Sequence, residues 1–122
     1  LSMVDTYQDV KVFMEAADQN ETGFGNQSDL YMNLIAEEFN ELLHAYKDKD
    51  MIEIADACRD LIWVIEGLEH TLEIPHQEVW DEVARSNLQK IDPVSGKVIK
   101  REDGKVLKPE GWTPPDIKSI FE

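Results

Sequence analysis

The segment of residues 51–71, "MIEIADACRDLIWVIEGLEHT", constrains the fold more than any other part of the chain. Its apolar residues recur on nearly every side of a helix and leave a single acidic stripe. A helix that is apolar almost all round is buried on most sides, which is more than one small chain of 122 residues can arrange. The segment therefore predicts an all-α core that is shared between copies of the chain.

The spacing of apolar residues predicts three further helices, at about residues 4–19, 30–47 and 75–89. Ser28 or Asp29 is the expected N-cap of the second of these helices. The connection "DKD" before residue 51 is so short that the helices on either side of it must run antiparallel. These patterns predict one domain over residues 1–122, with a helical core from about 4 to 91.

The chain changes character in its last third, at about residues 92–122. The sequences "KVIKR" and "KVLK" flank Asp103-Gly104, a spacing typical of a short β-hairpin. The segment "PEGWTPPDI" follows and predicts an extended, proline-rich strap that lies over the helical body. Trp112 in this strap either anchors the tail or covers a nucleobase.

Six carboxylates form two stripes on the helices that the short turn connects. In "LIAEEFNELLHAY" the acids lie at about 0°, 40° and 100° of helical rotation, so they project from one side. The acids of the next helix fall within roughly 60° of one another. If the two helices pair, the stripes meet. The six residues are Glu37, Glu38, Glu41, Glu53, Asp56 and Asp60.

Carboxylates without partners are costly inside an apolar helix pair unless a cation lies between them. Oxygen ligands suit Mg²⁺, with Mn²⁺ as a substitute, and six acids provide for two or more ions. Such ions clamp a polyphosphate, while a carboxylate free of metal takes a proton from the attacking water. The alternative is a solvated helix face, but no Lys or Arg follows Glu37, Glu38 or Glu41 by four residues. His44 is a further candidate ligand, or simply a surface histidine.

The formal net charge of −14 argues against a nucleic-acid partner, which would need a basic face. The charge is unevenly distributed, because residues 90–122 hold seven basic and six acidic side chains. A basic tail on an acidic body suits an anionic substrate that is carried by metal. No apolar run is long enough to span a membrane, and the single cysteine indicates no internal disulfide, so we expect a cytoplasmic protein. Met3 is the expected natural start, after Leu1 and Ser2.

These motifs resemble the all-α nucleoside triphosphate pyrophosphohydrolases. This group includes MazG-like proteins, dimeric all-α dUTP and dCTP pyrophosphatases, and phosphoribosyl-ATP pyrophosphohydrolase. Its signature is EExxE on one helix and ExxD on the next, which Glu37, Glu38, Glu41, Glu53 and Asp56 match. "VFMEAADQ", "EVARSNLQKID" and the tail "GKVIKREDGKVLKPEGWTPPDI" are similar to further family segments, so the resemblance covers almost the whole chain.

The resemblance implies a four-helix protomer in an obligate dimer or a dimer of dimers. It also implies Mg²⁺-dependent cleavage between the α and β phosphates of a nucleoside triphosphate, a reaction that cleans the nucleotide pool. Glu38 and Glu41 are the expected catalytic residues, and the EExxE and ExxD acids, with Asp60, the expected metal ligands. The expected substrate-binding residues are Gln19, Asn87, Lys90, Lys100, Arg101 and Lys105.

Two other interpretations stay open. Phosphoribosyl-ATP pyrophosphohydrolase performs the same chemistry on a biosynthetic substrate, although the tail favours the MazG-like branch. A helical interaction module without catalysis is the alternative from another class of protein. The sequence does not identify the preferred base or sugar, or distinguish a dimer from a tetramer.

Overall fold

The computed structural model describes residues 4–122; Leu1, Ser2 and the expected start Met3 lie outside the described residues. The elements in chain order are α1 (Thr6–Ala16), α2 (Asn26–Lys47), α3 (Met51–Thr71), α4 (His76–Leu88) and α5 (Ile117–Ile120). Residues 4–122 contain no named β-strand. The protein is therefore mainly helical, with four long helices, as the sequence predicted.

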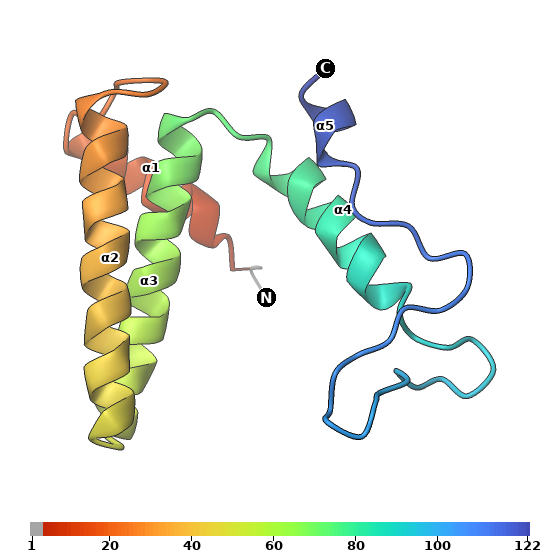
Figure 1. Ribbon diagram of the computed structural model, residues 1–122. Helices are drawn as coiled ribbons and strands as arrows, with labels where there is room; N and C mark the ends of the chain where they lie inside the picture. The colour runs from red at the N-terminus through yellow and green to blue at the C-terminus, as the bar shows by residue number, and fades with distance from the viewer. Residues whose placement is uncertain (1–3) are drawn as a thin grey trace. The chain divides into compact units, whose positions relative to one another are not determined.

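The chain divides into two compact units, Leu1–Ile74 and Pro75–Glu122, and each is described by itself. In the first unit, α2 and α3 lie side by side and antiparallel, and α1 packs against α3 (Figure 1). Asp50 caps α3 by accepting a hydrogen bond from the main-chain nitrogen of Glu53 (3.2 Å), so helix starts at the residue after a turn of Asp48 to Asp50. The predicted antiparallel pair is confirmed.

Helix α2 begins four residues earlier than the apolar pattern indicated. Gly25 is its N-cap, and the expected caps Ser28 and Asp29 lie inside the first turn. The Ser28 hydroxyl oxygen accepts from the main-chain nitrogen of Gly25 (2.9 Å), which satisfies a donor that precedes the helix. The prediction of the cap was wrong because Asn26 and Gln27 extend the helix with polar residues, which carry no apolar periodicity.

The core of the first unit is a cluster of Val10, Met14, Tyr31 and Val64. Tyr31 is only 2 % exposed, and its ring packs directly against the backbone of Gly67. A Cβ at position 67 would lie 2.1 Å from Tyr31 Cε1, so no other residue fits there without moving the ring. Gly67 on α3 thus leaves the space that the ring of Tyr31 from α2 occupies.

Several large apolar side chains of α2 and α3 remain exposed. Ile52 is 80 % exposed, Leu43 is 52 % and Phe39 is 51 %. Tyr46 on α2 is also exposed, so the apolar stripe of α2 is only partly buried within the chain. No helix of residues 4–122 is both long and apolar enough to cross a lipid bilayer.

The second unit consists of α4, α5 and the intervening tail. The predicted β-hairpin is not formed as a pair of strands: the tail contains only isolated antiparallel bridges, Ile91 with Val98 and Lys100 with Val106. The turn between the latter pair has Gly104 at φ +86°, a left-handed conformation that favours glycine. The turn at Asp103-Gly104 was predicted correctly, but too few residues pair on either side of it to form a β-ladder.

Candidate active site

The two acidic stripes lie on the facing helices of the α2–α3 pair. Glu37, Glu38 and Glu41 are in the second half of α2, and Asp56 and Asp60 are in the first half of α3. Because these helices are antiparallel and directly connected, the stripes run past each other. The structure therefore brings together acids that are separated by about twenty residues of sequence.

Glu38 has the most perturbed carboxyl of the site. Burial raises its pKa from 4.5 to about 7, helped by a side-chain hydrogen bond with Glu41 and by the negative charges of Glu41, Asp60 and Glu37. Its Oε2 atom is buried and has no hydrogen-bond partner. An ionised carboxylate is expensive in this position because its Oε2 atom is desolvated without a donor and negative charges lie nearby.

Asp60 on α3 also has a raised pKa, for the same kinds of reason as Glu38. Its pKa is raised first by burial, then by the charge of Asp56 and a hydrogen bond with it, and then by the charge of Glu41. The two perturbed carboxyls share Glu41 as a neighbour, so residues of both stripes belong to one electrostatic cluster. This proximity agrees with the convergence that helical spacing predicted.

Glu53 joins the cluster through an open cavity of about 340 Å³ between the ends of α2 and α3. Glu41, Glu53 and Asp56 line this cavity together with His44. The Nδ1 atom of His44 donates to the main-chain oxygen of Asn40 (2.9 Å), which leaves Nε2 as its outer nitrogen. The cavity is rich in carboxylate oxygen and borders solvent, so a hydrated ion has access to it.

The arrangement and the chemistry of these carboxylates bear separately on whether magnesium fits the site. Within residues 4–122, no three His, Cys, Asp or Glu side chains are gathered into an arrangement that could hold a metal ion as they stand. The buried, unpartnered oxygen of Glu38 and the purely carboxylate surroundings nevertheless match the chemistry of a hard cation. The negatively charged carboxylates repel one another, and a bound cation would offset this repulsion and allow their oxygens to approach.

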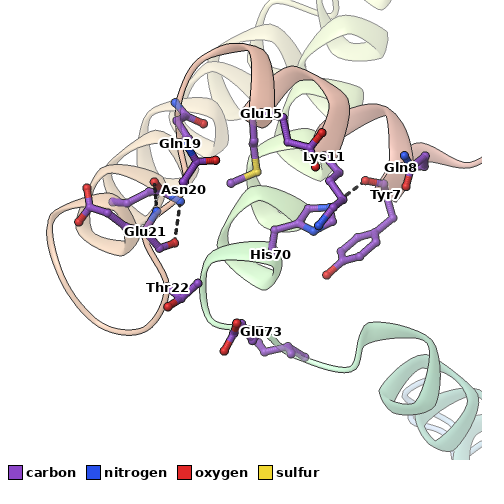
Figure 2. A pocket seen from close by; sticks show the side chains of 13 residues that line it. Tyr7, Gln8, Lys11, Glu15, Gln19, Asn20, Glu21, Thr22, His70 and Glu73 are labelled. Atoms are coloured by element: carbon purple, nitrogen blue, oxygen red, sulfur yellow. Dashed lines mark hydrogen bonds between the residues drawn. The ribbon is translucent and has the colours of Figure 1, made fainter.

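Gln19 lines a separate pocket of about 420 Å³ within the first unit. The pocket lies beside α1 and the loop that follows it, and Figure 2 shows Gln19 and Asn20 on one side and His70 and Lys11 on the other. Gln19 also accepts a hydrogen bond from the Tyr31 hydroxyl. The side-chain amide of Gln19 is thus fixed by a core residue.

The remaining predicted substrate-binding residues lie in the second unit. Lys90 donates to the side-chain oxygen of Asn87 (3.0 Å), so this pair forms one polar group at the C-terminal end of α4. Arg101 forms an ion pair with Asp103 (2.6 Å). Lys100 and Lys105 are exposed on the same turn of the tail.

Sequence reasoning missed the residues that shape the Gln19 pocket. Tyr31 was not assigned to the core, although it shares a helix face with Leu34, Ile35 and Glu38 at spacings of three and four. The rings of Tyr7 and His70 stack at 3.5 Å, and His70 Nε2 donates to the main-chain oxygen of Tyr7 (2.8 Å). This pairing joins residues 63 positions apart, so no local sequence signal could reveal it.

A comparison with known families identifies the group. The sequence profile of the phosphoribosyl-ATP pyrophosphohydrolase family matches residues 10–87, which is most of the chain and includes both acidic stripes. No curated protein matches the chain. The chain therefore belongs to the phosphoribosyl-ATP pyrophosphohydrolase family, and so to the superfamily of all-α nucleoside triphosphate pyrophosphohydrolases.

Proposed function

We propose that the protein is a Mg²⁺-dependent pyrophosphohydrolase that cleaves the α–β phosphoanhydride bond of a nucleoside triphosphate to give the monophosphate and pyrophosphate. The observation that carries the proposal is the buried, unpartnered oxygen of Glu38 among the acids of α2 and α3. A protein that only needed a stable helix pair would place apolar or paired residues there. The family match supports hydrolysis of a phosphoanhydride.

Glu37, Glu41, Glu53, Asp56 and Asp60 would hold two or more Mg²⁺ ions, with Mn²⁺ as a substitute. When bound, such ions neutralise phosphate charge and lower the pKa of a coordinated water. The protein's own residues present carboxylate oxygens and accept a proton. We assign proton acceptance to Glu38, with Glu41 as its hydrogen-bonded neighbour on the same helix face.

The substrate is a canonical or modified (d)NTP in our leading proposal, as in dUTPase-like proteins that remove unwanted nucleotides. Gln19 and Asn20 give the 420 Å³ pocket amide groups that can donate to and accept from the edge of a base, whereas the amide of Gln27 is already bonded to Glu21 and Thr71. The pocket and the acids belong to the same compact unit. Asn87, Lys90, Lys100, Arg101 and Lys105 would contact the sugar and phosphates.

Phosphoribosyl-ATP is the second candidate substrate, in histidine biosynthesis. The family profile that matches residues 10–87 bears this activity in its name and fits this candidate at least as well as the first. Both substrates carry a 5′-triphosphate and release pyrophosphate, so the acidic cluster serves either reaction. The candidates differ only in what the pocket must accept beyond the base, namely a second ribose phosphate.

We also propose that two copies of the chain associate through α2 and α3, as a homodimer or a dimer of dimers. The exposed side chains of Phe39, Leu43 and Ile52 support this, since large apolar residues left exposed on one helix pair are candidates for an interface with another chain. Light scattering after gel filtration tests the proposal. A monomer at micromolar concentration would contradict it.

The decisive experiment is a substrate panel. The protein is incubated with Mg²⁺ and canonical dNTPs, modified dNTPs, NTPs or phosphoribosyl-ATP, and pyrophosphate is assayed. We expect release from one group of substrates and none from a Glu38→Gln, Glu41→Gln double variant. Release from phosphoribosyl-ATP alone, with rescue of a histidine auxotroph, would select the second candidate.

The interaction-module alternative makes the opposite prediction. A protein without catalysis would release no pyrophosphate from any substrate and would show no Mg²⁺-dependent nucleotide affinity in calorimetry. It would also fold and bind its partner unchanged when Glu53 and Asp56 are neutralised.

A further inference from the structure

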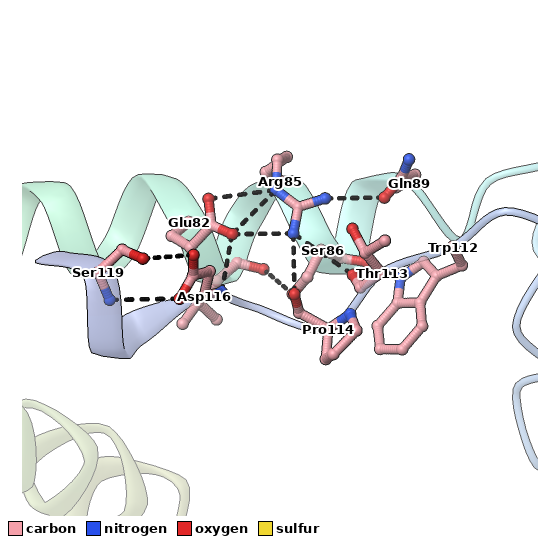
Figure 3. Close-up of polar contacts among 10 residues, drawn as sticks. Glu82, Arg85, Ser86, Gln89, Trp112, Thr113, Pro114, Asp116 and Ser119 are labelled. Carbon is pink, nitrogen blue, oxygen red and sulfur yellow. Dashed lines mark hydrogen bonds and ion pairs between the residues drawn. The ribbon is translucent and has the colours of Figure 1, made fainter.

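The proline-rich strap is fastened along one face of α4. Arg85 Nη2 donates to the main-chain oxygens of Thr113 (3.3 Å) and Pro114 (3.1 Å), and Glu82 accepts from the main-chain nitrogen of Asp116 (2.9 Å). Figure 3 shows this series of contacts, with Trp112 beyond Ser86. The strap therefore runs antiparallel to α4, and its end near Trp112 lies beside the end of the helix.

Trp112 is held in a single orientation at this point. A turn from Pro109 to Trp112 is closed by a main-chain hydrogen bond (3.1 Å) and has Gly111 at φ +81°, a conformation that favours glycine. The indole Nε1 donates to the main-chain oxygen of Ser86, a buried residue of α4. With its nitrogen engaged and its backbone fixed, the ring is a rigid surface within this unit.

Two lysines approach that one ring. The ammonium of Lys90, just after α4, lies 5.4 Å from the ring centroid, and that of Lys108, just before the turn, lies 4.8 Å from it. Both distances are within the range of cation–π attraction. Within residues 4–122, neither ammonium forms an ion pair with a carboxylate, in a chain where acids outnumber basic residues twofold.

Two unneutralised cations beside one aromatic ring repel each other, and the ring compensates only part of that cost. An anion that contacts both ammoniums offsets the repulsion and can accept a charge-assisted hydrogen bond from each. Adjacent phosphate groups suit two lysines better than a single carboxylate does, because they offer several oxygens and more than one charge. The side-chain oxygen of Asn87 also accepts a hydrogen bond from the Lys90 ammonium (3.0 Å) and so orients it.

We propose that Lys90 and Lys108, placed by Trp112, form a binding site for the pyrophosphate portion of the substrate and for the pyrophosphate product. This inference rests on the proposed function and deepens it by assigning Lys108 as a phosphate-binding residue and Trp112 as its positioning residue. Glu82 and Arg85 hold the strap along α4, and this contact places Lys108 and Lys90 at the same ring.

The test is calorimetric titration of the whole protein with inorganic pyrophosphate and with tripolyphosphate, in the absence of divalent metal. We expect Lys108→Met to weaken binding about tenfold and Lys108→Arg to retain most of it. Lys97→Met is the matched control, since it removes the same charge from an exposed position of the tail and should leave affinity unchanged. Equal losses in Lys97→Met and Lys108→Met would overturn the proposal, because they would show a general charge effect.

Trp112 is tested by two substitutions. Trp112→Phe keeps a ring for the lysines but loses the hydrogen bond to Ser86, and Trp112→Leu loses both. We expect pyrophosphate affinity to fall in the order wild type, Phe, Leu, with KM for the triphosphate rising in parallel and kcat changing less. Equal affinities of all three proteins for pyrophosphate would overturn the positioning role.

The outcomes also separate this inference from the proposed function. Metal-free pyrophosphate binding that depends on Lys108 supports the site even if no triphosphate is hydrolysed. Hydrolysis with a KM that Lys108→Met and Trp112→Leu leave unchanged would contradict the site and leave the proposed enzyme intact.

Discussion

The acids of the α2–α3 pair and the acids of the α4–tail unit occupy opposite electrostatic settings. In the first setting, burial and neighbouring carboxylates raise the pKa of Glu38 and Asp60. In the second, hydrogen bonds lower the pKa of Glu82 and Asp103, chiefly from the side chains of Arg85 and Arg101. Carboxylates of the first unit are thus left uncompensated, whereas those of the second unit are compensated by hydrogen-bond donors.

The difference separates structural acids from chemical ones. Glu82 has a defined task, since it fixes Arg85 and receives the main-chain nitrogen of Asp116. Glu38 stabilises nothing in the fold that we can identify, and its buried oxygen raises the free energy of the folded chain. An acid that lowers stability and has no structural role is expected at a site where an ion or a substrate becomes its partner.

The largest effect should come from replacing the uncompensated acid. We expect Glu38→Gln to reduce kcat of pyrophosphate release by about 10²- to 10⁴-fold, because the amide cannot accept the proton of the attacking water. Steady-state pyrophosphate assays measure the loss. Glu78→Gln, in the first turn of α4, is the matched control and should leave the rate unchanged. Full activity of Glu38→Gln would show that Glu38 is not the base.

The next effect is stabilisation by metal. Mg²⁺ at one hundred times its dissociation constant should raise the free energy of unfolding by about 2.7 kcal/mol, because it binds only the folded carboxylate cluster. Thermal melting with Mg²⁺ and with a chelator measures the change. An Asp56→Asn, Glu41→Gln variant should lose most of the response, whereas Glu82→Gln should keep it. An equal response in both variants would place the ion elsewhere.

A smaller effect should appear in the pH dependence of the metal-free protein. The pKa of Glu38 is about 7 in the folded chain and 4.5 ordinarily, so the folded state binds more protons between these values. The contribution of Glu38 to stability is therefore present at low pH and is lost as the pH rises through about 7. Denaturant unfolding of wild type and Glu38→Gln should show a difference that changes across this window. A difference independent of pH would mean that Glu38 titrates normally.

The smallest effect should come from the compensated acid Glu82. Its lowered pKa predicts the opposite sign, with stability lost as the pH falls below the ordinary value of a glutamate. Glu82→Gln should accelerate amide hydrogen exchange at Asp116, because the acceptor of that nitrogen is weakened. The first unit should exchange as in the wild type. Unchanged exchange at Asp116 would show that Arg85 alone holds the strap.

Local patterns were sufficient for the helices and for the acidic cluster. The apolar period of 3.6 placed α1, α3 and α4 to within a few residues, and the short turn determined the antiparallel pair. Since side chains three and four residues apart share a helix face, the acidic stripes followed from spacing alone. The cap of α2 and the position of Tyr31 did not, because they depend on Gly25 and on the space over Gly67.

The tail shows the limit of the same reasoning. Its turns were evident from Asp103-Gly104 and Gly111, but the predicted strands did not form. Nothing in the sequence singled out the polar face of α4 as a contact surface. In the structure, Glu82, Arg85 and Ser86 on that face hold the strap through main-chain atoms, which carry no sequence signal.

The sequence by itself thus determined the helical class, the pairing of α2 with α3 and the placement of the two acidic stripes on these paired helices, because each follows from periodicity and a short connection. Tertiary structure decided that Glu38 is a costly acid and that Glu82 is a compensated one. Burial of Glu38 and the approach of Lys90 and Lys108 to Trp112 depend on contacts between segments far apart in the chain. Desolvation and charge pairing are properties of such contacts, so they exist only once the chain has folded.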